Sequence, residues 1–453
     1  VIPDAERHGK PFSLFTVWFA TNMQVTAIFT GIVGVTLGLS LLWTIVAIVI
    51  GNVIGGVFMA LHSAQGPKLG LPQMIQSRAQ FGYFGAIVPL VLVMMMYIGF
   101  FASSAVLGGA TLASWTGLSP DLSIVIISAV CALLALVGYR MIHAVARWVS
   151  LVALLAYVYL GIRLLTQSYP HAHYGGGFDF GLFLLAVSIS ATWQITYAPY
   201  VADYSRYLPR STALRPAFWW TYGGSVISSI WMMAFGALIE SVAAKAFGGG
   251  STSFVVDLAS SAHWLFTLVI LSGVVVANTM NLYGTFMSSA TTLTALHPHG
   301  IGQVGRAVYV ISAGIVGGAV AIAGRGNFVN NYSNFILFLS YFLIPWTAIN
   351  LCDFYLVRKE RYDLKELFKA NGIYRKVNPR TMIAYFAAVA VEIPFMSTTF
   401  YSGPMVKVLG GADISWILGI IVSASLYFLL NKAIRESNKT AAGALQVEVE
   451  PAV

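Results

Sequence analysis

The sequence predicts an all-α polytopic membrane protein with twelve transmembrane helices, on three observations. The 453-residue chain is 58% hydrophobic and 9% charged, with a mean hydropathy of +0.79, which is more apolar surface than a soluble core can bury. Twelve stretches of roughly 20 apolar residues, each long enough to cross a bilayer, follow one another along the chain. The segments that connect these stretches also alternate between a high and a low content of lysine and arginine.

The apolar stretches define the predicted spans in chain order. We expect them near 13–39, 42–62, 84–110, 122–142, 148–166, 180–202, 217–244, 264–289, 304–324, 331–352, 382–401 and 414–433. Cys131 and Cys352 fall in different spans, far apart in the sequence, and so indicate no disulfide framework.

The basic residues predict the orientation of the chain. With the N-terminus placed in the cytoplasm, 21 of the 25 lysines and arginines lie in inner segments and four lie in outer ones. This asymmetry favours an even number of spans with both termini inside. We therefore expect a multi-pass protein of the cell membrane, taken as a bacterial inner membrane.

One sizeable hydrophilic segment divides the spans into ten and two, as an inverted repeat of five and five helices followed by accessory helices would do. The two halves show no residue-level similarity, so the repeat is a hypothesis. The expected organisation is a cytoplasmic N-terminal segment 1–12, a first repeat 13–166, a second repeat 167–352, a cytoplasmic loop 353–381, two accessory helices 382–433 and a cytoplasmic tail 434–453.

The stretch Ala191–Tyr207, ATWQITYAPYVADYSRY, points most directly to a binding site. It passes Trp193 and Gln194 at the expected mid-depth of the membrane and then meets Pro199. Proline removes a backbone donor, so a lipid-facing helix has little reason to carry one beside polar groups, whereas a cavity-lining helix has several. We predict an interrupted helix that presents these groups to a solute; an ordinary buried span with a kink is the alternative.

Three other spans carry neutral polar groups at mid-depth. Residues 21–26 of the first span hold Gln24 among other amides and hydroxyls, which need partners away from lipid. Phe100 and Ser104 are four residues apart, and Asn278 and Asn281 are three apart, so each pair shares a helix face. Hydrogen bonds that hold neighbouring helices together are the alternative role for each pair.

Together these spans offer aromatic faces, carboxamides and hydroxyls without fixed charge. This chemistry suits a neutral planar heterocycle, whose faces stack on Trp193 and Phe100 and whose ring edge pairs with an amide. A zwitterionic amino acid or an amine held by the ends of broken helices is the alternative substrate.

Few ionisable residues fall inside or beside the spans. Glu240 lies near the outer end of its span, and Glu392 lies nearer mid-span with a packing or proton-relay role. Asp203 and Arg206, which follow the interrupted helix, are expected to act in gating or fold integrity rather than in ligand contact.

Other functional classes fit the sequence less well. A channel would be expected to show a charged ring or a repeated filter sequence, and neither is visible. The spans show no metal-ligand cluster and no nucleophile beside a base, so we predict no enzyme, no cofactor, no resident metal and no nucleic-acid partner. The oligomeric state is left open.

Several motifs together resemble the nucleobase:cation symporter-1 family, and more closely its purine-cytosine permease branch. The resemblance covers nearly the whole chain and is carried by these segments: Val17–Asn22, the loop 61–82 with GPKLG, SR and FG, Gly138–His143, Tyr200–Tyr207 (YVADYSRY), Ala277–Asn278 with Asn281 and Tyr283, and Pro345–Ile349 with Asp353.

The resemblance implies a LeuT-type fold of two inverted five-helix repeats plus two helices, and cation-coupled import of a purine, cytosine or related ring by alternating access. It places the substrate at Gln24, Phe100, Ser104, Trp193 and Asn278, with Asn281 beside it, and Gln194, next to Trp193 on the interrupted helix, completes the predicted substrate-binding set. The third helix departs from the branch's usual Trp followed four residues later by Asn. Because a serine hydroxyl cannot make a two-pronged contact with a base edge, the departure puts cytosine itself in doubt.

The resemblance also implies a coupling cation, either sodium or a proton. A sodium site would use carbonyl groups near Ala20 and Met23 and the hydroxyl of Ser272. Gly273 stands where a second hydroxyl would help, and sodium needs about five or six oxygens. The choice between the two ions leans only slightly to sodium.

Overall fold

The computed structural model describes residues 1–137, 139–169, 172, 176–246, 252–296, 302–432 and 434. Within these residues the regular structure is helical, and β pairing is limited to two isolated bridges, Leu39 with Gly177 and Ser397 with Ser402. The expected cytoplasmic tail lies outside the described residues beyond residue 434. The predicted all-α class is therefore confirmed.

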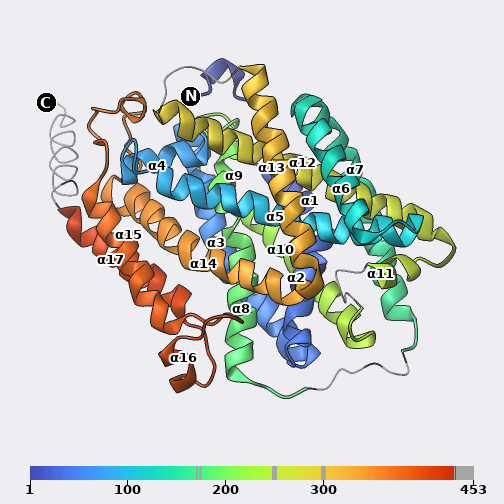
Figure 1. The fold of residues 1–453 in the computed structure, drawn as a ribbon. Coiled ribbons are helices and arrows are strands. Elements are labelled where there is room, and N and C mark those ends of the chain that lie inside the picture. The colour runs from blue at the N-terminus through green and yellow to red at the C-terminus, as the bar shows by residue number, and fades with distance from the viewer. Residues whose placement is uncertain are drawn as a thin grey trace, which may run out of the picture.

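Long helices form the body of the molecule, joined by shorter ones (Figure 1). The longer helices are α3 (Leu41–Leu69), α5 (Ile87–Thr116), α6 (Pro120–Val137), α7 (Tyr139–Thr166), α8 (Phe180–Ile195), α10 (Leu214–Val242), α12 (His263–Leu296), α13 (Gln303–Gly324), α14 (Phe328–Leu351), α15 (Pro379–Glu392) and α17 (Ser415–Leu430). The shorter ones are α1 (Phe12–Thr21), α2 (Val25–Thr36), α4 (Gln73–Phe81), α9 (Ala198–Ser205), α11 (Ser253–Asp257) and α16 (Pro404–Val408).

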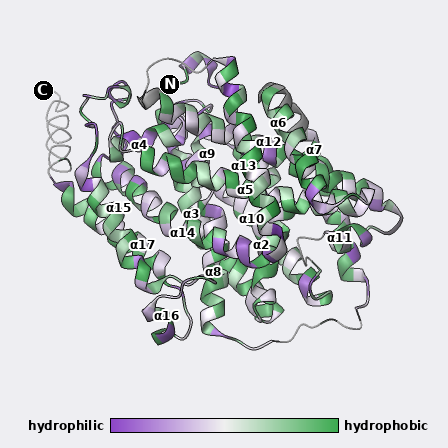
Figure 2. Ribbon diagram, in the orientation of Figure 1, coloured by the Kyte–Doolittle hydropathy of each residue, from purple (hydrophilic) through white to green (hydrophobic). Residues whose placement is uncertain are grey.

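Six segments of the described chain are long and apolar enough to cross a membrane, or seven if α1 and α2 count as one bent span. Hydrophobic residues run along most of the helices (Figure 2). Large apolar side chains such as Leu133, Leu155, Ile315 and Leu429 are more than 60% exposed on α6, α7, α13 and α17. Large apolar side chains that are this exposed are expected on helix faces that contact lipid.

The first predicted span is not a single helix. α1 and α2 meet at a 65° bend, and between them Gln24 has the extended backbone angles φ −141° and ψ 152°. The side chain of Asn22 donates to the carbonyl oxygen of Trp18, one turn earlier, at 3.0 Å. An asparagine amide that competes for backbone groups in this way favours a helix end.

The second break is the one that the sequence predicted, and it is milder than the first, because Phe180–Ser205 still runs as one apolar span. α8 ends at Ile195, and α9 starts at Ala198 with Pro199 in its first turn. Proline fits there because the first amide groups of a helix have no intrahelical acceptor. The Thr196 hydroxyl donates to the Trp193 carbonyl oxygen at 2.6 Å, which satisfies one acceptor left by the break.

Glycines allow helix backbones to approach closely around the two breaks. A Cβ added at Gly31 of α2 would overlap the backbone of Met233, and one added at Gly236 of α10 would overlap the carbonyl group of Ile28. Gly51 and Gly55 of α3 lie equally close to the backbone of α8. Small residues four apart at a helix interface are typical of membrane bundles.

The C-terminal helices differ from the prediction in one respect. α15 ends at Glu392, so the expected span 382–401 is too long, and the chain turns through residues 396–403 before α16. Pro394 explains the end, because proline offers no amide hydrogen for the next α-helical hydrogen bond, and the chain continues as a short 3-10 turn over Ile393–Phe395. α15 and α17 pack beside α14, on the side of the molecule away from α6 and α7 (Figure 1).

A buried carboxylate organises the end of the molecule that carries α4. α14 continues as a π-helical turn, η5 (Cys352–Val357), so the expected loop 353–381 begins as helix. Asp353, fully buried, accepts hydrogen bonds from Gln80 at 2.9 Å and Tyr427 at 2.8 Å, and pairs with Arg358 at 3.1 Å. Burial lowers the pKa of Arg358, but Asp353 and the neighbouring tyrosines Tyr427, Tyr362 and Tyr374 together raise it by more, so the net displacement of this pKa is upward.

Gly236 offers a test of the close packing between α2 and α10. Gly236→Ala would force a methyl group against the Ile28 carbonyl, and we expect the free energy of unfolding to fall by about 1–3 kcal/mol. Thermal unfolding of the purified protein measures the change. Gly161→Ala on α7 is the control, because an added Cβ there meets no atom within 4 Å and should leave the midpoint unchanged or higher. Equal midpoints for the two variants would contradict this packing.

Candidate functional site

Asn22, at the end of α1, joins the two broken helices to α10. Its side-chain oxygen accepts hydrogen bonds from the Trp193 indole N–H and the Tyr197 hydroxyl, both at 2.9 Å. Its amide nitrogen donates to the Ser228 hydroxyl at 3.1 Å and lies 3.3 Å from the Ser225 hydroxyl. Asn22 is fully buried, so one side chain satisfies polar groups from three segments that no water reaches.

Trp193, on α8, belongs to a group of aromatic rings that come from three helices. Its indole ring meets the ring of Phe100 on α5 edge to face, with centroids 5.9 Å apart. Phe100 in turn packs on Phe335 of α14 at 5.2 Å. Trp193 is only 2% exposed, whereas Phe100 is half-buried. The structure therefore brings together the two rings that the sequence singled out, and Phe100 is the more accessible of them.

The carboxamide groups of α2 and α12 lie on elements that touch this aromatic group. The Gln24 amide donates to the Thr21 carbonyl oxygen at 3.0 Å, and Gln24 is half-buried. Asn278, fully buried, donates to the carbonyl oxygen of Phe101, the neighbour of Phe100, at 3.0 Å. Asn281 lies 3.4 Å from the Asn278 side-chain oxygen and is half-buried.

Ser104 lies one turn beyond Phe100 on α5 and is 3% exposed. Its position on the same helix face as Phe100 is as the spacing predicts. Gln24, Phe100 and Asn281 are thus partly accessible, while Ser104 and Asn278 are buried.

Gln194 contacts a different part of the molecule from its neighbour Trp193. Its amide donates to Asn52 of α3 at 2.9 Å, and its oxygen accepts the Ser225 hydroxyl of α10 at 2.7 Å. Both ends of the carboxamide are therefore occupied in contacts with α3 and α10. The structure does not bring Gln194 together with Phe100 or Asn278.

Two of the candidate cation ligands, Ala20 and Met23, lie at the bend between α1 and α2, and the third, Ser272, lies on α12. The Ala20 carbonyl accepts the backbone N–H of Met23 at 3.0 Å, across the turn that ends α1. The Ser272 hydroxyl donates to Val269 of its own helix, α12, at 2.9 Å. A Cβ added at the neighbouring Gly273 would meet no atom within 4 Å, so there is room for a side chain there.

The residues predicted to act in gating occupy helix ends. Asp203 accepts the backbone N–H of Gln73, the first residue of α4, at 2.8 Å. A carboxylate is favourable at a helix N-terminus because the exposed N–H groups carry partial positive charge. The Arg206 guanidinium donates to the Asp203 carbonyl at 3.2 Å and lies over the Tyr207 ring at 5.2 Å. Glu392 lies in the accessory pair, apart from these groups.

Aromatic rings close the bundle on either side of Trp193. Toward α9, Trp18 packs on Tyr197 at 5.4 Å and on Tyr204 at 5.3 Å. Toward the start of α14, the hydroxyls of Thr30 and Tyr332 lie 2.6 Å apart, which ties α2 to α14. These side-chain contacts tie α1 to α9 and α2 to α14 around the aromatic group.

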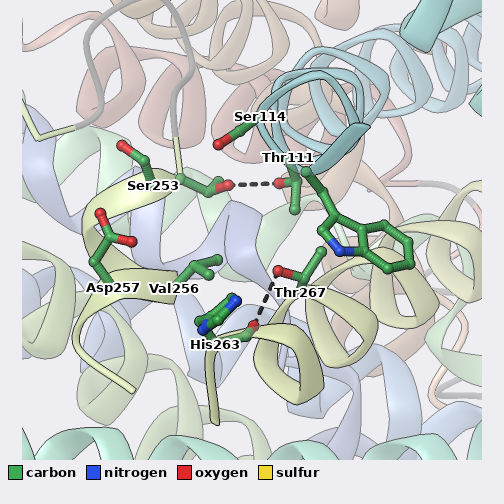
Figure 3. A pocket seen from close by; sticks show the side chains of 9 residues that line it. Thr111, Ser114, Ser253, Val256, Asp257, His263 and Thr267 are labelled. Carbon is green, nitrogen blue, oxygen red and sulfur yellow. Dashed lines mark hydrogen bonds between the residues drawn. The ribbon is translucent and has the colours of Figure 1, made fainter. Parts of the chain in front are cut away.

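A separate pocket of about 230 Å³ lies where the ends of α5, α11 and α12 meet (Figure 3). Thr111 and Thr252 lie 2.5 Å apart within it, and Thr267 donates to the His263 carbonyl oxygen at 3.0 Å. Thr111 lies eleven residues beyond Phe100, or about 16 Å along the helix. The pocket is lined by Thr111, Ser114, Trp115, Thr252, Ser253, Val256, Asp257, His263 and Thr267. None of these residues was singled out from the sequence.

Apolar helices, two of them broken beside a buried polar and aromatic centre, define a multi-pass membrane transporter. The chain belongs to the family of permeases for cytosine/purines, uracil, thiamine and allantoin, whose model matches residues 1–419. This match confirms the resemblance to nucleobase:cation symporters and the expectation of a transporter rather than an enzyme.

Two named relatives agree with the family. The chain is 46% identical, over 95% of its length and 94% of the relative, to YxlA of Bacillus subtilis, whose own name as a purine-cytosine permease is provisional. It is 25% identical to the purine-cytosine permease fcyB of Emericella nidulans, over 95% of this chain and 86% of that one.

Solved structures share the fold. Mhp1, a nucleobase-cation-symport-1 family transporter in a closed conformation with bromovinylhydantoin bound, matches with a TM-score of 0.73 and 22% identity, over 96% of this chain and 94% of Mhp1. The inward-facing conformation of Mhp1 matches with a TM-score of 0.75. At this identity the likeness concerns the fold.

Asn22 and Tyr197 have a central role in this hydrogen-bond arrangement, but neither was among the site residues predicted from the sequence. The signal for Asn22 was present, because its amide lies among the polar residues of the first span that need partners away from lipid. Nothing in the sequence indicated that Trp193 and Tyr197, from another broken helix, would both donate to one oxygen of Asn22.

Asn22→Ala tests this arrangement. The substitution leaves the indole N–H of Trp193 and the Tyr197 hydroxyl without their acceptor, and each buried donor left unpaired costs about 1–3 kcal/mol. We expect a clear fall in the thermal midpoint of the purified protein. Ser228→Ala is the control, because Asn22 then keeps its other contacts and the fall should be smaller. Equal falls would remove Asn22 from the centre of the arrangement.

Proposed function

We propose that this permease imports a neutral planar nucleobase or a related heterocycle across the cell membrane, by alternating access coupled to a cation. The observation that carries the proposal is the composition of the centre. Phe100 and Trp193 provide aromatic faces, Gln24 and Asn281 provide partly accessible carboxamides, and no Asp, Glu, Lys or Arg is among the candidate ligands.

The candidate ligands take separate roles in this proposal. Phe100 stacks on the ring, with Trp193 as the wall behind it. Gln24 and Asn281 pair with the polar edge of the ring, Asn278 holds Asn281 in position, and Ser104 supplies a hydroxyl one turn from Phe100. Gln194 serves the interface of α8 with α3 and α10 and touches the substrate only if the helices rearrange.

The proposed architecture follows the family resemblance. The chain forms twelve transmembrane helices, with two inverted repeats over residues 13–166 and 167–352 and an accessory pair over 382–433. Both termini and the loop 353–381 lie on the cytoplasmic side, supported by the excess of lysine and arginine there.

Uptake into proteoliposomes tests the substrate class. We expect radiolabelled purines, pyrimidines, hydantoins or ring vitamins to accumulate when a sodium or proton gradient is imposed, and amino acids and amines not to accumulate. Failure of every ring compound would overturn the proposal, and accumulation of an amino acid would favour a symporter of the same fold with a charged substrate.

Phe100→Leu tests the stacking role. The change keeps apolar volume but removes the flat face, and stacking of a base on an aromatic ring contributes about 1–3 kcal/mol. We expect the substrate dissociation constant to rise roughly tenfold or more. Phe386→Leu, whose ring is 53% exposed on α15, is the matched control and should bind as the wild type does. Unchanged affinity in Phe100→Leu would remove this ring from the site.

The coupling ion can be tested at Gly273. We propose that sodium binds between the carbonyl groups of Ala20 and Met23 and the Ser272 hydroxyl, with fewer oxygens than sodium prefers. Gly273→Ser adds a hydroxyl where there is room for it, so the sodium concentration for half-maximal uptake should fall severalfold. Gly161→Ser on α7 is the control. Sodium-independent uptake in the wild type and in both variants would favour the proton as the coupling ion.

A further inference from the structure

Glu392 lies at the junction of three helices, outside the centre described above. It is the last residue of α15 and is fully buried. Gly419 of α17 makes room for it, since a Cβ added there would overlap a carboxyl oxygen of Glu392. The same Cβ would lie 3.6 Å from a methyl group of Ile344 on α14, so the carboxyl group is enclosed by α14, α15 and α17.

Neither carboxyl oxygen of Glu392 has a hydrogen-bond partner among the described residues. The neighbouring Asp413, which is 1% exposed, is the opposite case. It accepts the Tyr341 hydroxyl at 2.6 Å, the Ser397 N–H at 2.9 Å, and both the N–H and the hydroxyl of Ser415, at 2.9 and 2.5 Å. All four of these donors bond to the carboxyl group of Asp413, and none of them bonds to that of Glu392.

The charged surroundings of Glu392 oppose a second negative charge. Asp413, on the segment before α17, is close enough for its charge to act on Glu392. The other titratable groups that face Glu392 are Tyr341 on α14 and Tyr385 on α15, while α17 offers Gly419. None of the ion pairs in the described part of the chain includes Glu392.

An ionised carboxyl group in this position would be shielded from solvent and would have no donor and no counter-ion among the residues that the structure describes. Burial of such a charge without compensation costs far more than the small net stability of a folded protein, so the group takes up a proton instead. We propose that Glu392 is a proton-binding site, separate from the substrate site, whose carboxylic acid form is the form packed against α14 and α17.

The site has a physical route to the substrate centre through α14. Asp413 holds Tyr341, and the same helix carries Phe335, which packs on Phe100, and Tyr332, which bonds Thr30 of α2. Release of the proton would place a charge next to Asp413 and weaken the packing of α15 and α17 on α14. The bound proton therefore favours the packing of α15 and α17 against α14, the helix that contacts the substrate centre.

Infrared spectroscopy of the purified wild-type protein in detergent tests the proposal without any substrate. We expect the carbonyl band of a protonated carboxyl group near neutral pH, and we expect Glu392→Gln to lack it. Glu240→Gln is the matched control, because Glu240 is also a buried membrane glutamate but one of its oxygens accepts the Lys245 N–H at 2.8 Å. This control should keep the Glu392 band.

Thermal unfolding supplies a second readout. The folded wild type holds a proton that the unfolded chain releases, so its stability should fall as the pH rises from about 6 to 9. One proton corresponds to about a tenfold change in the folding equilibrium constant per pH unit. Glu392→Gln should lose this dependence, and Glu240→Gln should keep it.

Two results would overturn the proposal. One is a wild-type spectrum with no protonated carboxyl band near neutral pH, which decides the matter even if Glu392→Gln fails to fold. The other is a folded Glu392→Gln protein that keeps both the band and the full pH dependence. Neither result depends on which solute the protein transports.

Discussion

The structure depends on one constraint: backbone and side-chain polar groups exposed by broken helices must find partners inside the bundle, because lipid offers none. Asn22 meets this constraint where α1 ends, with its oxygen shared by Trp193 and Tyr197 and its nitrogen directed at α10. The same contacts fix the indole ring against Phe100. Stability and the shape of the candidate site therefore rest on the same hydrogen bonds.

Close glycine packing supplies the rigid part of this arrangement. Gly31 and Gly236 bring α2 and α10 into backbone contact, so the break in the first span is held against a fixed neighbour. Other contacts around the centre are made by side chains, as where the Tyr332 hydroxyl meets that of Thr30 and Trp18 packs on Tyr197. The bundle therefore combines backbone contact at glycines with side-chain contact between its helices.

Buried carboxyl groups have three distinct environments in this protein. Asp353 has an arginine and several donors, Asp413 has four donors, and Glu392 has neither. The first two fasten the ends of α14 and α17 to their neighbours by hydrogen bonds. The third can occupy its position only as an acid, which links the accessory helices to the pH of the surroundings.

The sequence by itself determined the helical class, the break near Pro199 and the shared helix face of Phe100 and Ser104, because hydropathy, proline and helical spacing act locally. It did not determine the contacts of Asn22 with Trp193 and Tyr197, or the contact of Gln194 with Asn52. Those features depend on which helix supplies a hydrogen-bond partner or a glycine gap. Partners hundreds of residues apart, such as Thr30 and Tyr332, meet only once the bundle has assembled.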